Sequence, residues 1–222
     1  GNKTGVTPTG IDQNSASIPA DGLTSVTAST STNRITTSGW EYDLTGNLIR
    51  GQNVSGTWQK FEYDAAGRLK KIKDVSSNVI ETYTYGATRE RLMSETSSQR
   101  TWYVWGGQSV VAEYVETGSG TTPNYNKSYI YAGTRLLMTT TKASSTTETK
   151  EFHHPDRLGT KLVTNGGTGT SYQQSTLPFG IALGAESSGY SNQVFTSYDR
   201  SGATGLDYAV NRSYSQGQSR FS

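Results

Sequence analysis

Tyr42-Asp43-Leu44-Thr45-Gly46-Asn47-Leu48 is the stretch that decides the fold, because it returns 21 residues later as Tyr63-Asp64-Ala65-Ala66-Gly67-Arg68-Leu69. A third, degenerate copy begins at Tyr85, has Gly86 in place of the aspartate and closes with Arg89-Glu90-Arg91-Leu92. Self-similarity at a fixed period is typical of repeat architectures, in which one supersecondary unit stacks on the next.

Each copy has the composition of a hairpin corner. Tyr favours strands, Asp accepts hydrogen bonds from backbone amides ahead of it, and Gly allows a positive φ. The sequence therefore predicts a strand over 57–63, a reversal over 64–67 and a returning strand over 68–73. Two strands and two turns account for a period of about twenty residues. The repeat corners are expected at Tyr42, Asp43 and Gly46 and at Tyr63, Asp64 and Gly67.

Four further hairpin turns are predicted, at Gly106-Gly107, at Ala132-Gly133, over 143–150 and over 165–169. Both faces of the strand over 58–63 mix apolar and polar residues, and no stretch has apolar residues at helical spacing with caps. We therefore predict an all-β protein whose antiparallel hairpins form a curved or spiralling sheet wall, wetted on both faces, with essentially no helix.

The repeated phrase resembles the YD repeat of the RHS family, which includes bacterial polymorphic toxins, shell-forming components of insecticidal toxin complexes and animal teneurins. The C-terminal part resembles the family's RHS repeat-associated core, with its motifs in the family's order. The departures are Asn211, Ser213 and Ser219, where the family has Ala, Tyr and Gly. The residues that carry this second resemblance are His154, Pro155, Asp156, Leu158, Gly159, Pro178, Phe179, Gly180, Gly205, Leu206, Asp207, Tyr208, Arg212, Tyr214, Arg220 and Phe221.

The chain divides into three expected parts. Residues 1–38 are rich in Ser and Thr and are expected to be the tail of a preceding repeat, because Gly1-Asn2 resembles the second half of the phrase. Residues 39–150 hold the YD-repeat hairpins, and residues 151–222 hold the core segment. Because no initiator Met or signal peptide is present, we expect a piece of a longer repeat protein.

Charge and residue types argue against several classes of function. Twenty basic and 18 acidic residues give a net charge of only +2, which does not indicate a basic surface for binding nucleic acid. No run approaches the roughly 18 apolar residues of a membrane span. His153 and His154 are neighbours, so on a strand they point to opposite faces, and with no Cys a zinc site is not expected. A His-Pro turn at His154-Pro155 is the preferred interpretation, and no cofactor or metal is predicted.

The resemblance implies a non-catalytic structural module of an RHS-type shell that encloses a C-terminal toxin or other cargo. RHS autoproteases use Asp-Pro motifs, which this chain lacks, so Asp199 and Asp207 are not expected to cleave. The alternative is an extracellular fibre or adhesin subunit that assembles by strand addition. Its Trp58, Trp102 and Trp105 would stack on surface glycans. Expected partners are the rest of a longer chain or identical subunits, and the expected location is secreted or on a bacterial cell surface.

Overall fold

The computed structural model describes residues 26–222, except 119, 175, 178, 183–190, 211, 219 and 222. Within these residues there are seventeen strands and no helix, which confirms the all-β prediction. Pro178, Asn211, Ser219 and most of the predicted segment 1–38 lie outside the described residues.

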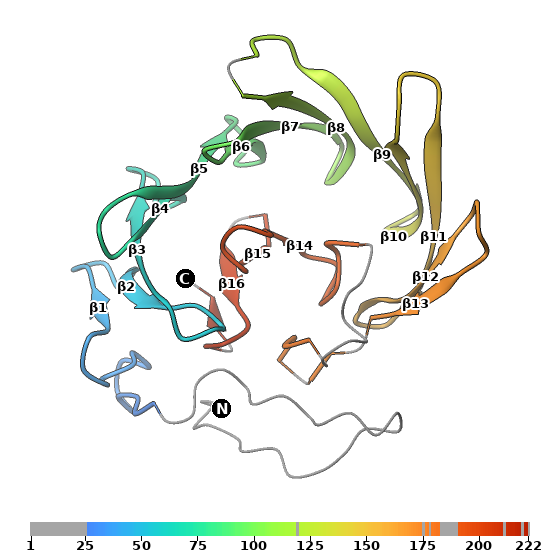
Figure 1. Ribbon diagram of the computed structural model, residues 1–222. Helices are drawn as coiled ribbons and strands as arrows, with labels where there is room; N and C mark the ends of the chain where they lie inside the picture. Colours follow the sequence, from blue (N-terminus) through green and yellow to red (C-terminus); the bar gives the residue numbers. More distant parts are fainter. Residues whose placement is uncertain are drawn as a thin grey trace.

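Thirteen antiparallel strands form one sheet, called here the wall, in which every strand pairs with its neighbours in sequence. Figure 1 shows the wall curving into an open arc. Because every pairing is local, the sheet needs no crossover connection. The strands are β1 (Glu41–Tyr42), β2 (Leu48–Gln52), β3 (Trp58–Tyr63), β4 (Leu69–Asp74), β5 (Val79–Tyr85), β6 (Arg91–Glu95), β7 (Gln99–Gly106), β8 (Ser109–Thr117), β9 (Asn124–Ala132), β10 (Arg135–Lys142), β11 (Glu148–Asp156), β12 (Gly159–Asn165) and β13 (Ser171–Gln173).

A second sheet of four short strands, the inner sheet, lies inside this arc (Figure 1). It consists of β14 (Asp199–Arg200), β15 (Asp207–Tyr208), β16 (Ser213–Ser215) and β17 (Arg220–Phe221), and the name is used here to include the loop over 201–206 that joins β14 to β15. The boundary predicted between residues 150 and 151 falls within β11, and the chain changes sheet only after β13.

The inner face of the first strands is drier than the sequence interpretation expected. Leu206 of the inner sheet joins one buried apolar cluster with Leu48, Phe61 and Leu69 of the wall. The prediction of a wall wetted on both faces is therefore wrong over β1 to β5. The reason is that a distant segment of the chain covers this face, which strand alternation alone does not reveal.

Five turns of one geometry, the corners, join β1 to β6. In each corner, the backbone N–H of the first residue donates to the carbonyl of the residue four positions later. The carbonyl of the first residue accepts from the N–H of the residue three positions later, and all these bonds measure 2.8–3.3 Å. The corners predicted at Asp43 and Asp64 are confirmed, and two intervening corners repeat the same turn on the opposite edge. The corners begin at Asp43, Asn53, Asp64, Asp74 and Gly86, and their positive-φ residues are Gly46, Gly56, Gly67, Ser77 and Arg89.

The side-chain oxygen of the first corner residue reinforces the reversal. Oδ1 of Asp64 accepts hydrogen bonds from the backbone N–H groups of Ala66 and Arg68, both at 2.9 Å. Oδ1 of Asn53 accepts equivalent bonds from the two N–H groups at the same offsets in its own corner. An Asn therefore replaces an Asp here because the turn uses an acceptor oxygen and not a charge.

The repeat tyrosines couple one repeat to the previous one. The hydroxyl of Tyr63 donates to the carbonyl of Leu48 at 3.0 Å, and that of Tyr85 donates to the carbonyl of Leu69 at 2.7 Å. One repeat further on, Trp105 Nε1 donates to the carbonyl of Arg91 at 2.9 Å, so Trp105 takes the place of a repeat tyrosine. A ring with a polar tip at this position fills the inner face and satisfies a backbone acceptor.

Most of the later predicted hairpins are confirmed, but the His-Pro turn is wrong. His154 and Pro155 lie within β11, where the register of the β11–β12 pair shifts between them. A bulge tolerates a Pro in a strand, since it interrupts the ladder where the missing N–H would be needed. The chain reverses two residues later, at Arg157 and Leu158.

We expect Gly67→Ala to lower the free energy of unfolding by about 1–2 kcal/mol, because Gly67 has φ +73° and an L-residue is strained there. A Cβ at Gly67 would meet nothing within 4 Å, so strain alone is tested. Gly202→Ala is the matched control, because it adds a Cβ in equally open space without a positive φ. Urea denaturation measures both, and equal midpoints would contradict the role of the corner.

Tyr63→Phe removes only the hydroxyl that reaches the carbonyl of Leu48. The loss should cost about 1 kcal/mol, the usual net contribution of one hydrogen bond. The same measurement on Tyr85→Phe should give a similar loss, because its hydroxyl bonds to the equivalent carbonyl of Leu69. An unchanged urea midpoint in both variants would show that ring packing alone couples the repeats.

Candidate functional site

A charged side chain occupies an apolar position of the third repeat. The repeat tyrosine pairs with a buried Leu across each corner, as in Tyr42 with Leu48 and Tyr63 with Leu69. In the third repeat Tyr85 pairs with Arg91, which is only 4% exposed. The sequence interpretation placed Leu92 there, although the six-residue spacing from Tyr to Leu points to Arg91. This arginine is the centre of the candidate site.

Groups from both sheets surround the Arg91 side chain. Its guanidinium forms an ion pair with Asp199 of β14. Its Cζ lies 4.5 Å from the ring centroid of Tyr103 in the wall and 4.3 Å from that of Tyr208 in the inner sheet. The backbone N–H of Arg91 donates to the Tyr208 hydroxyl at 2.8 Å. Arg91 therefore holds an acid and an aromatic ring of the inner sheet at once.

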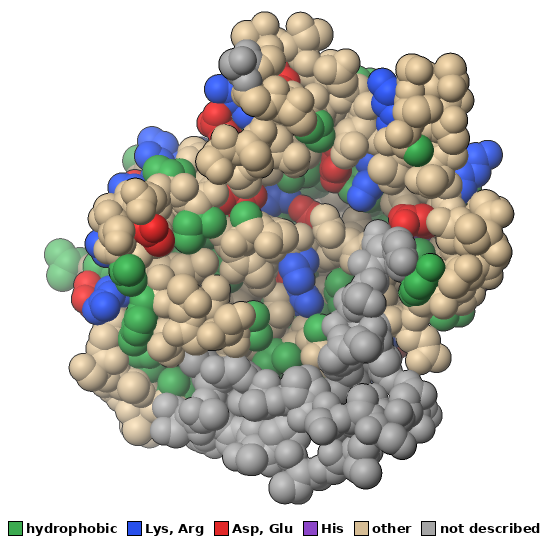
Figure 2. Space-filling view, viewed as in Figure 1, with side chains coloured by type: hydrophobic (Ala, Val, Ile, Leu, Met, Phe, Trp, Pro, Cys, Tyr) green, Lys and Arg blue, Asp and Glu red, His purple; other side chains and the backbone are tan. Residues whose placement is uncertain are grey.

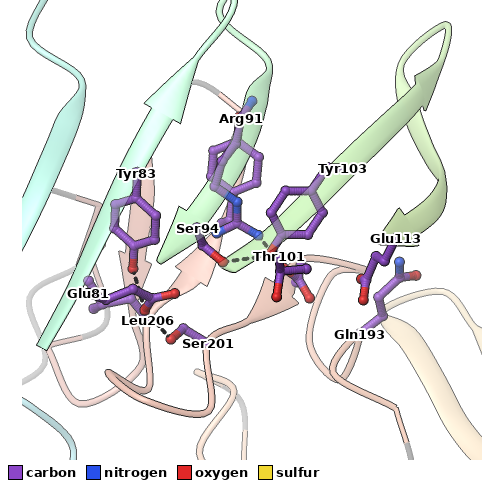
Figure 3. A network of polar contacts seen from close by, with 12 residues as sticks. Glu81, Tyr83, Arg91, Ser94, Thr101, Tyr103, Glu113, Gln193, Ser201 and Leu206 are labelled. Atoms are coloured by element: carbon purple, nitrogen blue, oxygen red, sulfur yellow. Dashed lines mark hydrogen bonds and ion pairs between the residues drawn. The ribbon is translucent and has the colours of Figure 1, made fainter. Parts of the chain in front are cut away.

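Buried acids continue this network on either side of Arg91 (Figure 3). Glu81 accepts hydrogen bonds from Tyr83 in the wall at 2.8 Å and from Ser201 in the inner sheet. Glu113 accepts from the hydroxyl of Tyr129. The contact between Glu81 and Ser201 is thus a second polar link between the wall and the inner sheet.

Burial and nearby charged groups shift the pKa values of Arg91 and Glu113. Burial by itself would lower the pKa of Arg91, but the neighbouring acidic groups, Tyr103 and Asp199 foremost, hold that pKa above its usual value. Burial raises the pKa of Glu113, and the nearby charge of Asp199 adds to the rise. Arg91 is therefore a fixed positive charge, and a fixed charge in a dry site must keep its counter-ion.

A polar cavity of about 530 Å³ lies beside this network, between the wall and the inner sheet. Figure 2 shows acidic and basic side chains together in the hollow on this face of the molecule, among uncharged groups. The mixture provides hydrogen-bonding groups of both kinds without a strong field of one sign. Lining residues include Glu81, Arg91, Tyr103, Glu113, Lys127 and Asp199.

The two aspartates of the core segment have separate partners. Asp207 is completely buried and accepts from Arg200 Nε at 2.7 Å and from Arg200 Nη2 at 3.0 Å. Asp199 is paired with Arg91 instead. Two carboxylates that each face their own guanidinium do not share a proton, which an aspartyl dyad requires.

The residues that resemble the RHS core are divided between the wall, which holds those from His154 to Gly159, and the inner sheet with the segments next to it. Gly180 has φ +89°, and a Cβ there would lie 2.7 Å from the ring of Phe195, so only Gly fits. The Tyr214 hydroxyl donates to the carbonyl of Phe179 at 3.0 Å. Arg220 donates to the carbonyl of Asn33, before the first wall strand, at 2.6 Å. These contacts join residues of the predicted set to segments distant in the sequence.

Other members of that set also make local contacts. Oδ1 of Asp156 accepts from the N–H of Leu158 at 2.6 Å, which shapes the turn after β11. Gly159 has φ +116°, with the backbone of the segment before the inner sheet only 3.0 Å from where a Cβ would lie. The Arg212 guanidinium lies 4.3 Å from the ring centroid of Phe221. Gly205 has φ +74°.

The three candidate glycan-stacking tryptophans have different surroundings. The Cζ atom of Arg50 lies over the ring of Trp58, 4.7 Å from the ring centroid. Trp105 packs edge-on against Tyr208. Trp102 is 37% exposed. Trp58 and Trp105 are partly buried, whereas Trp102 is exposed. Because a ring must be accessible to stack on a sugar, the glycan hypothesis depends mainly on Trp102.

The part of the chain that the structure describes holds no group of three His, Asp or Glu side chains placed to bind a metal ion. Nor do those residues include a helix long and apolar enough to span a membrane. His153 is buried and hydrogen-bonded to Thr139 at 3.1 Å, whereas His154 is exposed, as the alternation of a strand requires.

Fold and site together define a β-repeat wall that holds an inner sheet through buried polar contacts. No protein-family model matches the chain, and no curated protein matches it. A crystal structure of TcdB2-TccC3 is similar in fold, with a TM-score of 0.64 at 15% identity over 89% of this chain and 11% of that chain.

Two related structures give the same result. TcdB2-TccC3 without its hypervariable C-terminal region has a TM-score of 0.59 at 14% identity, over 89% of this chain and 10% of that one. The Tc holotoxin pore of Photorhabdus luminescens with a mutated TccC3 has a TM-score of 0.59 at 15% identity, with the same coverage. The chain thus spans about a tenth of the structures it matches, and at this identity the likeness shows a shared fold.

His153 should make stability depend on pH. Burial, followed by the positive charge of Lys127, lowers the pKa of His153 from 6.5 to about 4. As the pH is lowered, His153 is protonated in the unfolded chain before it is protonated in the folded chain. Its contribution to the free energy of unfolding is therefore fully present above pH 6.5 and falls by roughly 3 kcal/mol between pH 6.5 and 4. Urea unfolding of His153→Gln should show a smaller decline over this window. His154→Gln removes the smallest of the three causes that lower the pKa of His153, so its decline should stay close to that of the wild type; equal slopes in all three would contradict the assignment.

Proposed function

We propose that this chain is a non-catalytic wall module of an RHS-type shell that encloses a C-terminal toxin or other cargo. The observation that carries the proposal is a wall of thirteen sequential antiparallel strands curved around an inner sheet. Local pairing lets such a wall lengthen by adding repeats without changing the existing ones. Its fold likeness to TcdB2-TccC3 supports a toxin-complex setting.

The RHS assignment has support in the mechanics of the repeat. Tyr63 and Tyr85 bond the preceding repeat, Asp64 closes the corner and Gly67 supplies the positive φ. Every defining position of the YD phrase thus has a physical task in the wall. Because this chain spans about a tenth of the matched chains, we propose that a complete shell contains many more such repeats.

A non-enzymatic role agrees with the site. The buried carboxylates are held by arginine, tyrosine or serine partners, which stabilises them as structural groups. We further propose a secreted protein, in line with its likeness to a Tc holotoxin. In this proposal the enclosed cargo is the main partner, and surface glycans are not required.

Electron microscopy of the full-length protein tests the proposal. We expect discrete hollow particles, together with internal polypeptide that resists added protease until the particles are opened by denaturant. The denatured sample is the control for protease sensitivity. Regular filaments without a cavity would contradict the shell and favour the fibre alternative, in which free sheet edges pair between subunits.

A further inference from the structure

We infer that Arg91 fixes the position of the inner sheet along the wall. The wall offers similar repeats, and consecutive repeats are two strands, or roughly 10 Å, apart. An inner sheet held by apolar contacts alone could therefore occupy neighbouring positions with similar contacts. Such contacts are non-directional, so they favour burial without selecting a register.

The first two repeats present nearly the same apolar surface to the inner sheet. Leu48 and Leu69 occupy equivalent positions and belong to one cluster with Leu206 of the inner sheet. Moving Leu206 by one repeat would exchange one leucine environment for another. Arg91 is the residue at the third equivalent position, and it differs in charge, shape and hydrogen-bonding capacity.

The observed position of the inner sheet gives Arg91 a counter-ion and an acceptor for its backbone N–H. There, Asp199 neutralises its guanidinium and Tyr208 accepts its backbone N–H at 2.8 Å. A shift by one repeat would bring Asp199 towards Leu69 and leave Arg91 buried without a counter-ion. Removing one partner of a buried pair is strongly destabilising, whereas replacing both by apolar groups is often neutral. Polar groups of this kind select one arrangement more than they add stability.

A second polar contact lies one strand away and has the same consequence. Glu81 is 5% exposed and accepts from the Ser201 hydroxyl of the inner sheet. The equivalent wall position one repeat earlier does not offer this acid, because the residue four before Tyr63, as Glu81 is four before Tyr85, is the uncharged Gln59. Arg91 and Glu81 thus distinguish the third repeat from the others. This role is independent of what the wall encloses, because it depends only on contacts within the chain.

Amide hydrogen exchange, followed by NMR on the full chain, provides the test. The N–H of residue 91 donates to the Tyr208 hydroxyl, so its exchange rate reports whether the inner sheet is in place. The amide of Ile72, which is buried within the wall, reports the wall itself. The test variant is Arg91→Leu with Asp199→Leu, which restores the leucine of the repeat and removes both members of the ion pair.

In this double variant we expect the residue-91 amide to exchange at least tenfold faster, while the Ile72 amide stays within twofold of the wild type. The inner-sheet amides should also show more than one set of signals. Arg100→Leu is the matched control, because Arg100 is an exposed arginine of the same wall whose partners, Glu95 and Glu116, both belong to the wall, and it should change neither rate.

Two results would overturn the inference. Slow exchange at residue 91 with a single set of inner-sheet signals would show that Leu206 and its apolar contacts suffice to fix the position. Equal acceleration at residues 91 and 72 would show that the Arg91 pair stabilises the whole fold and does not select a register. Failure of the shell proposal would leave these exchange rates unaffected, so the two ideas are separately testable.

Discussion

The hydrogen-bonded corner is the constraint on which the rest of the structure depends. A side-chain oxygen holds two backbone amides ahead of it, and a residue with positive φ completes the reversal. Because the turn recurs on both edges of the sheet from β1 to β6, each of these strands pairs with its sequence neighbour. The wall is therefore assembled from local contacts, which cost little loop-closure entropy.

Coupling between repeats adds the second level of order. The polar tips of Tyr63, Tyr85 and Trp105 each reach the carbonyl at the equivalent position one repeat back. These bonds run between paired neighbouring strands, from β3 to β2, from β5 to β4 and from β7 to β6, so each ties a repeat tyrosine or its Trp counterpart to the repeat before it. An aromatic ring at this place also contributes apolar surface, and this combination explains the preference for Tyr over Phe.

The inner sheet changes the environment of the side chains on the inner face of the wall. Without it, Leu48 and Leu69 would expose apolar surface and Arg91 would face solvent. With it, the leucines form a core around Leu206 and Arg91 becomes a buried cation with an acidic partner. The same repeat position thus serves packing in two copies and recognition of the inner sheet in the third. One substitution in a repeat is enough to give a periodic surface a unique docking position.

The sequence by itself determined the hairpins, their turn residues and the absence of helix in the described chain, because strand propensity, turn chemistry and repeat spacing are local. It also contained the six-residue spacing that identifies Arg91. Only the tertiary structure decided which face is dry, that His154 and Pro155 continue a strand, and that Asp199 and Tyr208 meet Arg91. The dry face and the Arg91 contacts depend on residues more than one hundred positions apart, and no local pattern encodes which distant segment covers a sheet face. The strand through His154 and Pro155 depends instead on its pairing with β12, whose register shifts between these two residues.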